Sequence, residues 1–326
     1  MVCMLTRQDV RKALPMPRAI EAVRDAFVQL SAGQADVPLR TALDVPRHNG
    51  VTLFMPAYLA ADDTMALKIV SVYDDNPDRG LPLIHALVVV VDAKTGAPAA
   101  IMDGTYLTAL RTGAASGVAT EALARPEARV AAIFGAGAQG RTQLEAVCAV
   151  RSIEDAWIYD VGSERAEQYA DEMADLLDVN VRVARTPVQA VRSADVICTA
   201  TTSSSPVFDD ADVQPGTHIN AIGAYTPEMQ EIPPQTVLRA KVVIDHHEAA
   251  LAEAGDLLIP IDRGLMTSEH ISAELGEVVA GDKPGRKSSD EITLFKSVGV
   301  AVQDVATAAA VLEAARKMGL GTDVAL

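Results

Sequence analysis

The chain has 326 residues, of which 49% are hydrophobic, so it is long enough for two domains with apolar cores. This composition excludes global disorder. The 44 Asp and Glu residues outnumber the 28 Lys and Arg residues and give a net charge of −16. That balance disfavours nucleic acid as a partner, because phosphate binding needs a basic face.

The N-terminal segment predicts a helix followed by strands. Ile20, Val23, Phe27 and Leu30 recur at helical spacing, and Gly33 ends the pattern. Apolar runs then predict four strands, at residues 52–55, 66–72, 87–91 and 99–102. A short turn ending in glycine joins the last two strands into a hairpin.

Small residues dominate the stretch from Asp103 to Leu123, with Arg111 among them, which indicates another helix. This helix leads toward Arg125-Pro126-Glu127, which we predict to be a domain boundary.

The most informative stretch runs from Val130 to Gly140, where an apolar strand pattern leads directly into G-x-G-x-x-G and a helical pattern follows. Gly135 allows the tight turn from strand to helix, Gly137 lets the backbone approach a pyrophosphate, and Gly140 lets the helix pack on the strand. The N–H groups at the start of the helix point at the phosphates in such sites. The stretch therefore predicts a dinucleotide site.

Asp160 supports this prediction. It ends the next apolar strand, about 20 residues after the glycine motif, where the fingerprint needs a carboxylate for the ribose 2′-hydroxyl. This position favours NAD(H). Arg165 is near enough in sequence to keep NADP(H) open as an alternative.

Strands and helices alternate from Val130 onward, which is typical of a doubly wound parallel sheet. Six strands are predicted, at residues 130–134, 156–159, 179–183, 195–200, 218–223 and 242–245. A helical pattern returns at Val302 and Val305, and we expect it to cross back to the first domain. The prediction is an α/β protein with a Rossmann domain at residues 126–299 and a second domain built from residues 1–125 and 300–326.

The three cysteines, Cys3, Cys148 and Cys198, show neither disulfide nor metal spacing and are interpreted as reduced core thiols. The first residues carry charges and have no signal-length apolar run, and no stretch approaches ~20 uncharged apolar residues. We expect a cytoplasmic protein with no membrane partner.

Several polar residues are interpreted as structural. His246-His247 is read as part of a strand, where adjacent side chains point to opposite faces, so no metal site is predicted. His48 and His85 lie in the first domain and could approach a pocket, but satisfied structural histidines are more common. We interpret three acids as solvated charges: Asp256, Glu274 and Glu277.

With these elements placed, the sequence resembles the ornithine cyclodeaminase and mu-crystallin family, which also contains archaeal-type alanine dehydrogenases and reductases of cyclic imino acids. The resemblance spans nearly the whole chain. It is carried by residues 37–40, 54–58, 67–73, 107–116, 135–140 and 294–299. It implies a homodimer in which the Rossmann domain binds NAD(P)(H) and both chain ends form an α+β catalytic and dimerisation domain.

The resemblance also implies that the nicotinamide faces Arg40, Lys68 and Arg111. Two arginines can hold a carboxylate with paired N–H donors, and a lysine on an apolar strand is a desolvated ammonium able to bind or donate a proton. The ordinary alternatives are an edge-strand Lys68 that reaches water, and surface ion pairs for the two arginines.

The expected cofactor contacts come from the glycine motif, from Asp160, from a polar loop after a strand end, and from segments that approach the nicotinamide in the family. They are Thr112, Gly135, Gly137, Ala138, Gln139, Gly140, Asp160, Thr201, Ser297 and Gly299.

Two departures from the family pattern disfavour ornithine as the substrate. Family members that cyclise ornithine carry an aspartate two residues before a proline in the loop after the fifth strand, and Tyr225 stands there in this chain. They also carry a glutamate shortly before Met-Pro for the distal ammonium, and Leu53 stands at that position. Tyr225 is a candidate to line the substrate pocket or to act as a weak acid, and the alternative is a turn tyrosine packed on its own loop.

The sequence therefore predicts an NAD(P)H-dependent reductase of a small cyclic ketimine such as Δ1-pyrroline-2-carboxylate, yielding an imino acid such as L-proline. Lys68 is the predicted catalytic residue, and the predicted substrate-binding residues are Arg40, Lys68, Arg111 and Tyr225. Alanine dehydrogenation and ornithine cyclisation are alternatives within the family. A non-catalytic protein that holds a nucleotide and a small ligand is the alternative from another class.

Overall fold

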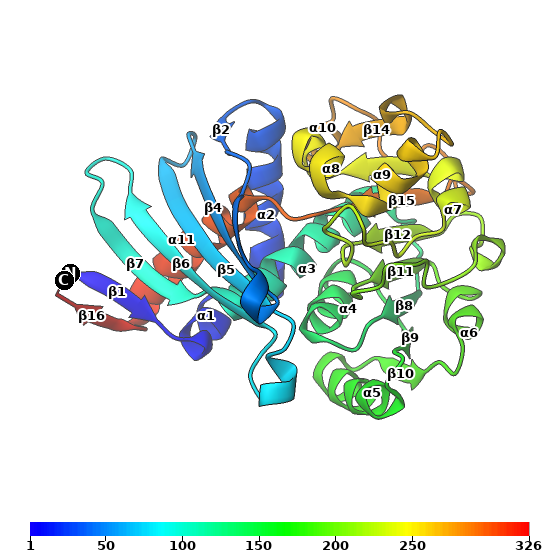
Figure 1. Ribbon diagram of the computed structural model, residues 1–326, viewed down its shortest axis with the longest axis horizontal. Helices are drawn as coiled ribbons and strands as arrows, with labels where there is room; N and C mark the ends of the chain where they lie inside the picture. The colour runs from blue at the N-terminus through cyan, green and yellow to red at the C-terminus, as the bar shows by residue number, and fades with distance from the viewer. Residues whose placement is uncertain (326) are drawn as a thin grey trace. The chain divides into compact units, whose positions relative to one another are not determined.

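The computed structural model describes residues 1–325 (Figure 1). The chain forms two compact units, one made of Met1–Arg111 with the chain from Val300 onward, and the other of Thr112–Gly299. The first crossing between units lies inside one continuous helix, upstream of the predicted boundary at Arg125-Pro126-Glu127. The second lies directly before the last long helix.

The first unit contains β1 (Val2–Leu5), α1 (Arg7–Ala13), α2 (Met16–Ser31), β2 (Ala35–Asp36), β3 (Thr41–Val45), β4 (Gly50–Leu59), β5 (Thr64–Tyr73), β6 (Ile84–Asp92), β7 (Pro98–Asp103), the start of α3 (Gly104–Leu123), α11 (Ala301–Met318) and β16 (Thr322–Val324). Helix α2 carries the predicted apolar stripe and buries Ile20, Val23 and Phe27. The four predicted strands are all present, each longer than its apolar run.

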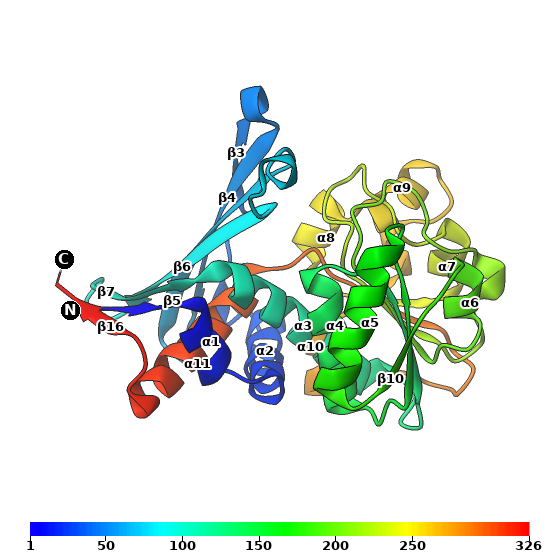
Figure 2. The ribbon, with the colours of Figure 1, turned by 90° about the horizontal axis from the view of Figure 1, so that it is seen from below.

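The strands of the first unit form one eight-stranded sheet in the order β16-β1-β7-β6-β5-β4-β2, with β3 paired to β4. Strands β4 to β7 are consecutive antiparallel neighbours, so the predicted hairpin is confirmed as β6 and β7. Helix α11 packs on the central strands β4, β5 and β6 and also contacts α1 and α2. Figure 2 shows these three helices gathered on one side of the sheet.

The second unit contains β8 (Val130–Phe134), α4 (Ala138–Val150), β9 (Asp155–Tyr159), α5 (Ser163–Leu177), β10 (Asn180–Val183), α6 (Pro187–Val191), β11 (Val196–Thr199), β12 (His218–Ala221), α7 (Pro234–Arg239), β13 (Lys241–Ile244), α8 (His247–Glu253), α9 (Gly255–Asp262), β14 (Ile271–Glu274), α10 (Leu275–Ala280) and β15 (Thr293–Lys296). The six predicted strands are all present.

The sheet of the second unit is parallel throughout, in the order β10-β9-β8-β11-β12-β15-β13-β14. Its first five strands have the 3-2-1-4-5 order of a Rossmann fold, which confirms the predicted fold class. The sheet has eight strands. The sequence predicted six of them and missed β14 and β15. Strand β15 is only four residues long, contains a lysine, and lies between β12 and β13.

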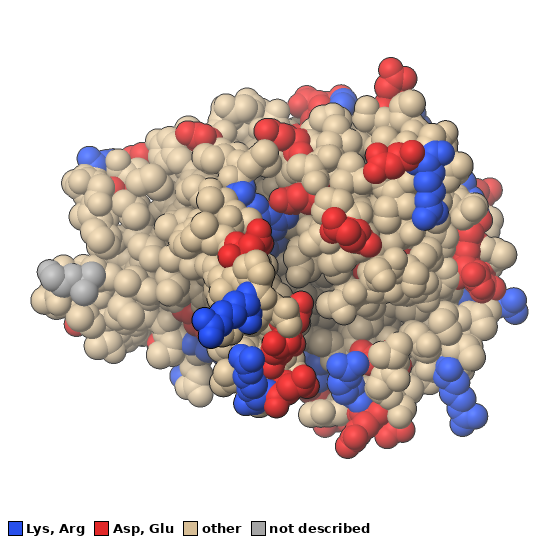
Figure 3. Space-filling model, in the orientation of Figure 1, with Lys and Arg blue, Asp and Glu red and all other residues tan. Residues whose placement is uncertain are grey.

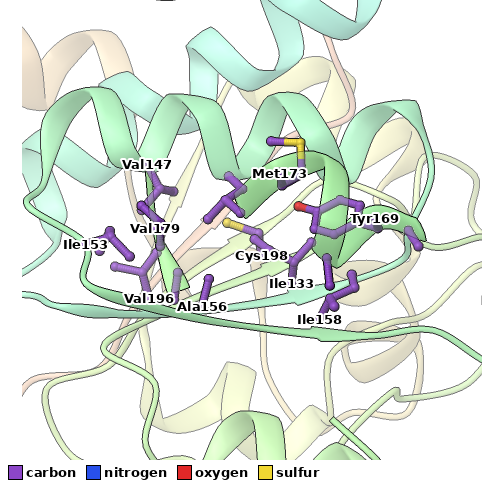
Figure 4. Close-up of a cluster of buried hydrophobic side chains, with 14 of the residues drawn as sticks. Ile133, Val147, Ile153, Ala156, Ile158, Tyr169, Met173, Val179, Val196 and Cys198 are labelled. Atoms are coloured by element: carbon purple, nitrogen blue, oxygen red, sulfur yellow. The ribbon is translucent and has the colours of Figure 1, made fainter. Parts of the chain in front are cut away.

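One apolar core of this unit lies between the strands and the helices α4 and α5 (Figure 4). Ile133, Ile158 and Cys198 come from the sheet, and Val147 and Tyr169 come from the helices. Tyr169 is fully buried, and its hydroxyl donates to the carbonyl of Gly140 at 2.9 Å. The core therefore fixes helix α5 to the first turn of α4, next to the glycine motif.

On the face drawn in Figure 3, Lys and Arg side chains lie scattered among Asp and Glu and form no broad basic patch. Among residues 1–325, no helix combines the length and the apolar character needed to cross a membrane.

Candidate active site

Lys68 lies at the centre of the first sheet. Its strand β5 is flanked by β4 and β6, where Lys68 pairs with Met55 and Val88. The residue is 1% exposed. The alternative of an edge-strand lysine that reaches water is therefore wrong, and an ammonium in this position needs a partner inside the protein.

Asp304 is that partner. Its Oδ2 lies 2.8 Å from Lys68 Nζ, and both side chains are 1% exposed. Asp304 occupies the first turn of α11, where the helix dipole favours a negative charge. Sequence reasoning missed it, although it is an acid within the apolar periodic pattern around Val302 and Val305.

Arg111 joins the same carboxylate from α3. Its Nε donates to Asp304 Oδ1 at 3.0 Å, and its Nη1 donates to the side-chain oxygen of Gln303 at 2.6 Å. Arg111 is 6% exposed, so the alternative of a surface ion pair is wrong for this residue. Arg40 is half-buried just before β3, close enough for its charge to act on Lys68.

The electrostatics of this cluster lower the pKa of Lys68 from 10.5 to about 7. Burial is the largest cause, and the positive charge of Arg111 adds to it. Asp304 opposes both effects by its charge and its hydrogen bond. Lys68 can therefore exchange a proton near neutral pH, as a general acid must.

The side chains beside Lys68 are apolar. Cross-strand partners share a face, so Met55 and Val88 flank Lys68, and the pair Leu53 and Val70 follows two residues along the strands on the same face. Leu53 thus lies on the Lys68 face, where its side chain offers no anion to a distal ammonium.

In the second unit, the glycine motif has the backbone that a pyrophosphate requires. Gly135 has φ +102°, and a Cβ on Gly140 would lie 2.1 Å from the Gly135 carbonyl oxygen. A Cβ on Gly137 would meet no atom within 4 Å, so this backbone faces open space. Helix α4 begins directly after Gly137 with no side chain capping it, which leaves its first N–H groups for an anion. These residues fit a dinucleotide.

Asp160 lies beside the glycine motif. Its Oδ2 accepts from the Ala136 N–H at 2.8 Å, while its Oδ1 accepts from the Gly162 N–H at 2.8 Å and pairs with Arg165 at 2.7 Å. Burial opposes ionisation of Asp160, but the two backbone donors and Arg165 outweigh it and lower the pKa. The carboxylate is therefore charged and held at the loop, as a ribose-binding acid must be.

The other predicted residues of this unit lie in helices and loops. Thr112 is buried in α3, and Ala138 and Gln139 begin α4. Ser297 and Gly299 follow β15 and both donate to the buried carboxylate of Asp245, at 2.7 and 2.8 Å. Tyr225 is half-buried in the loop after β12, so it belongs to a different unit from Lys68.

Two interpretations from the sequence are wrong. Asp256 is fully buried rather than solvated, and it accepts hydrogen bonds from the N–H groups of Glu231 and Ile232 and from Lys296 Nζ. Asp256 follows alanine and glycine at the start of a helix, and nothing in that pattern separates it from an exposed acid.

The histidine pair is the second correction. His246 caps α8 and His247 begins that helix, so the two do not belong to a strand. The structure also places His48 and His85 at exposed positions. His218, which sequence reasoning passed over, is fully buried, and burial lowers its pKa to about 3.

Comparison with known proteins gives the family of this chain. The model of the ornithine cyclodeaminase/mu-crystallin family matches residues 2–319. The chain belongs to this family.

The following relatives are similar over nearly their full length. Delta(1)-pyrroline-2-carboxylate reductase of Bacillus cereus is 39% identical over 318 residues, covering 97% of this chain and 98% of the relative. The structure of Thermococcus litoralis Delta(1)-pyrroline-2-carboxylate reductase in complex with NADH and L-proline is 45% identical, with a TM-score of 0.97 and coverage of 99% of this chain and 100% of that one. An archaeal alanine dehydrogenase dimer with bound NAD is 37% identical, with a TM-score of 0.93 and 99% coverage of both chains.

Proposed function

We propose that this family member is an NADH-dependent reductase that converts Δ1-pyrroline-2-carboxylate to L-proline. The observation that carries the proposal is the buried cluster of Lys68, Asp304 and Arg111 beside an apolar sheet face. Full-length similarity to the Bacillus cereus and Thermococcus litoralis reductases supports the same substrate.

The charge of the cluster suits a monocarboxylate. Lys68 and Arg111 are cationic groups that share one carboxylate, that of Asp304. The surplus positive charge is the complement of one substrate carboxylate, which an arginine can hold with paired donors. In this role Arg40 and Arg111 bind the substrate and set its orientation.

Lys68 handles the reacting proton. When bound, NADH supplies the hydride that adds to the C=N carbon. As the π electrons of that bond move onto nitrogen, the Lys68 ammonium gives its proton to the nitrogen and becomes a neutral amine, which solvent reprotonates. Asp304 stabilises the ammonium before transfer and keeps Nζ in place.

The apolar surroundings favour a cyclic imine over a diamine. Leu53, which is partly exposed on the Lys68 face, can pack against ring methylenes, whereas an ornithine side chain would bury its distal ammonium without a counter-charge. Tyr225, in the place of the cyclodeaminase aspartate, offers no carboxylate base. Ornithine cyclisation is therefore the weaker alternative.

Alanine dehydrogenation is the second candidate, favoured by the 37% identity to the archaeal alanine dehydrogenase. Steady-state NADH oxidation with Δ1-pyrroline-2-carboxylate, with pyruvate plus ammonia, and with other keto acids plus amines separates the two. We expect the cyclic imine to have the largest kcat/KM. A larger value for pyruvate plus ammonia would favour alanine dehydrogenase, and no turnover on any substrate would favour a binding protein.

We also propose a homodimer formed through the sheet face opposite Lys68. On that face the register aligns Pro56, Leu67, Val89 and Ile101 in one apolar row, all of them partly exposed in a single copy. Leu87, in the next row, is 38% exposed. A partly exposed apolar sheet of this extent is typical of a protein interface.

We further propose a cytoplasmic location. All three cysteines, Cys3, Cys148 and Cys198, are free thiols, as expected in a reducing compartment. Burial raises the pKa of Cys148 and of Cys198 to about 12, so both stay protonated and unreactive.

A further inference from the structure

Glu231 is a fully buried acid that takes no part in the chemistry described above. It follows the loop after β12, and its carboxylate reaches two other loops of the second unit. Its Oε1 accepts from the N–H and the hydroxyl of Thr201, at 2.6 and 2.8 Å. Its Oε2 accepts from the N–H groups of Gly223 and Ala224, at 2.8 and 3.1 Å, and from the Thr199 hydroxyl at 2.9 Å.

These contacts join the loops that follow two neighbouring strands, β11 and β12, at the carboxyl edge of the sheet. The two loops approach so closely that a Cβ on Gly223 would lie 2.3 Å from the Thr201 carbonyl oxygen and 2.5 Å from Glu231 Oε1. One carboxylate thus binds the backbone of both loops.

The loop after β11 also lies against the glycine motif. A Cβ on Gly135 would lie 2.6 Å from the carbonyl oxygen of Ala200 and 3.4 Å from the Thr201 side chain. A continuous set of contacts therefore runs from Glu231 through Thr201 to Gly135. Movement of Thr201 would change the space beside the motif that we propose binds the pyrophosphate.

Glu231 is itself held in place by a second buried acid. Its own N–H donates to Asp256 Oδ1 at 2.7 Å, and the other oxygen of Asp256 pairs with Lys296 Nζ at 2.9 Å, with both side chains fully buried. Lys296 is the last residue of β15, the strand next to β12. The backbone that carries Glu231 is thus fixed to the sheet.

We propose that Glu231 is a positioning residue for the half of the cofactor site that receives the nicotinamide. The inference rests on the proposed NADH-dependent function. The strand order of the sheet reverses between β8 and β11, and a dinucleotide spans such a switch point. β11 and β12 lie on one side of this point, and Asp160, which follows β9, lies on the other. Glu231 fixes the loops on the first side, whereas Asp160 serves the adenosine side.

Glu231→Gln tests this assignment. Both carboxylate oxygens face backbone N–H groups, so in either orientation an amide nitrogen would face a donor at 2.6 to 3.1 Å and push one loop away. The matched control is Glu228→Gln, which makes the same change at an exposed position three residues earlier in the chain. Both proteins are compared with wild type by fluorescence titration with NADH and by calorimetric titration with ADP, which lacks the nicotinamide half.

We expect Glu231→Gln to raise the Kd for NADH at least tenfold while the Kd for ADP stays within twofold, and Glu228→Gln to change neither. If Glu231 had a purely structural role, its substitution would raise the Kd values of both ligands together, or would lower Tm and leave both Kd values unchanged. Either result overturns the proposal. If wild type binds ADP but not NADH, the proposed function fails rather than the role of Glu231.

A second measurement needs no variant. Hydrogen exchange of the wild-type protein should show the N–H groups of Thr201, Gly223 and Ala224 protected at least a hundredfold relative to an exposed loop amide, although all three lie beyond the strand ends. Exchange of these three N–H groups at the rate of an exposed loop would contradict the proposal that Glu231 holds the two loops. This measurement tests the proposal even if Glu231→Gln does not fold.

Discussion

Asp304 Oδ2 lies 2.8 Å from Lys68 Nζ in a place where both side chains are 1% exposed. The two residues come from distant parts of the chain, one from the sheet of the first unit and the other from the helix that begins directly after the second unit ends. A buried ion pair is costly to desolvate and costly to break, so its presence in this cluster is best explained by the chemistry of the lysine.

Asp304→Asn should lower kcat/KM by about 100-fold or more, the usual scale for a disturbed proton donor. Asp304 raises the pKa of Lys68, so its loss lowers that pKa below about 7. The alkaline limb of the pH profile of kcat/KM should therefore move to lower pH. Glu313→Gln, on an exposed turn of the same helix, is the control and should leave the profile unchanged. If the alkaline limb of the Asp304→Asn profile stays at the wild-type pH, Asp304 does not control the proton-donating lysine.

Lys68→Met keeps much of the side-chain volume but removes the charge and the proton. Turnover should fall by at least ~100-fold while the Kd for NADH is unchanged, because the change affects proton donation and not the dinucleotide site. Lys68→Arg should restore little, since a planar guanidinium replaces a compact ammonium poorly. Lys94→Met, on an exposed turn, serves as the control. Near-normal turnover of Lys68→Met would refute the catalytic assignment.

Raising the pH should have opposite effects on activity and stability through Lys68. The folded-state pKa of about 7 lies below the ordinary 10.5, so the unfolded chain binds more protons between these values. Stability from this group therefore rises with pH across that window, by at most about 1.4 kcal/mol per pH unit, while the ammonium needed for turnover is lost. The check is the Tm difference between wild type and Lys68→Met from pH 7 to 10, which should shift in favour of wild type. A constant difference would mean that Lys68 keeps its ordinary pKa.

Asp160→Ala should weaken NADH binding by about 10- to 100-fold without unfolding the protein, because a charge-assisted hydrogen bond contributes about 1.5–3 kcal/mol. Asp171→Ala, an exposed acid on α5, is the control for the lost charge. Fluorescence titration gives both Kd values. A second result from the same experiment bears on the cofactor: tighter binding of NADPH than NADH by wild type would contradict the ribose assignment and implicate Arg165.

Val89→Asp should convert the dimer to a monomer, because it places a carboxylate in the middle of the apolar row on the outer sheet face. Sedimentation velocity gives the mass directly. Leu176→Asp makes a similar change at a side chain that is 52% exposed in the other unit and should leave the mass unchanged. A monomeric wild-type protein would disprove the dimer, and a dimeric Val89→Asp would place the interface elsewhere.

Local sequence patterns predicted those elements whose physical requirements are local. The glycine motif needs only a strand, three glycines and a helix in order, and Gly135 and Gly140 lie where that rule puts them. The strand with Lys68 was predictable from its apolar run, and the lysine inside that run marked it as a candidate site residue.

Partners that come from distant segments could not be predicted in this way. Asp304 and Lys68 meet only because α11 returns to the first sheet, and no spacing rule connects positions so far apart. Asp256 was missed because an acid after alanine and glycine looks solvated until the fold closes over it, and Glu231 was missed because its neighbours Gln230 and Ile232 form no pattern that marks a buried acid. Strand β15 was missed because four residues carry too little periodicity to show a strand.

The central claim is that NADH reduces the C=N carbon of Δ1-pyrroline-2-carboxylate on this chain. The most direct measurement is mass spectrometry of the product formed from this imine and NADH doubly deuterated at C4 of the nicotinamide. The account predicts L-proline with one deuterium at Cα, formed by wild type and reduced at least ~100-fold in Lys68→Met. Absence of proline, or proline without deuterium at Cα, would contradict it.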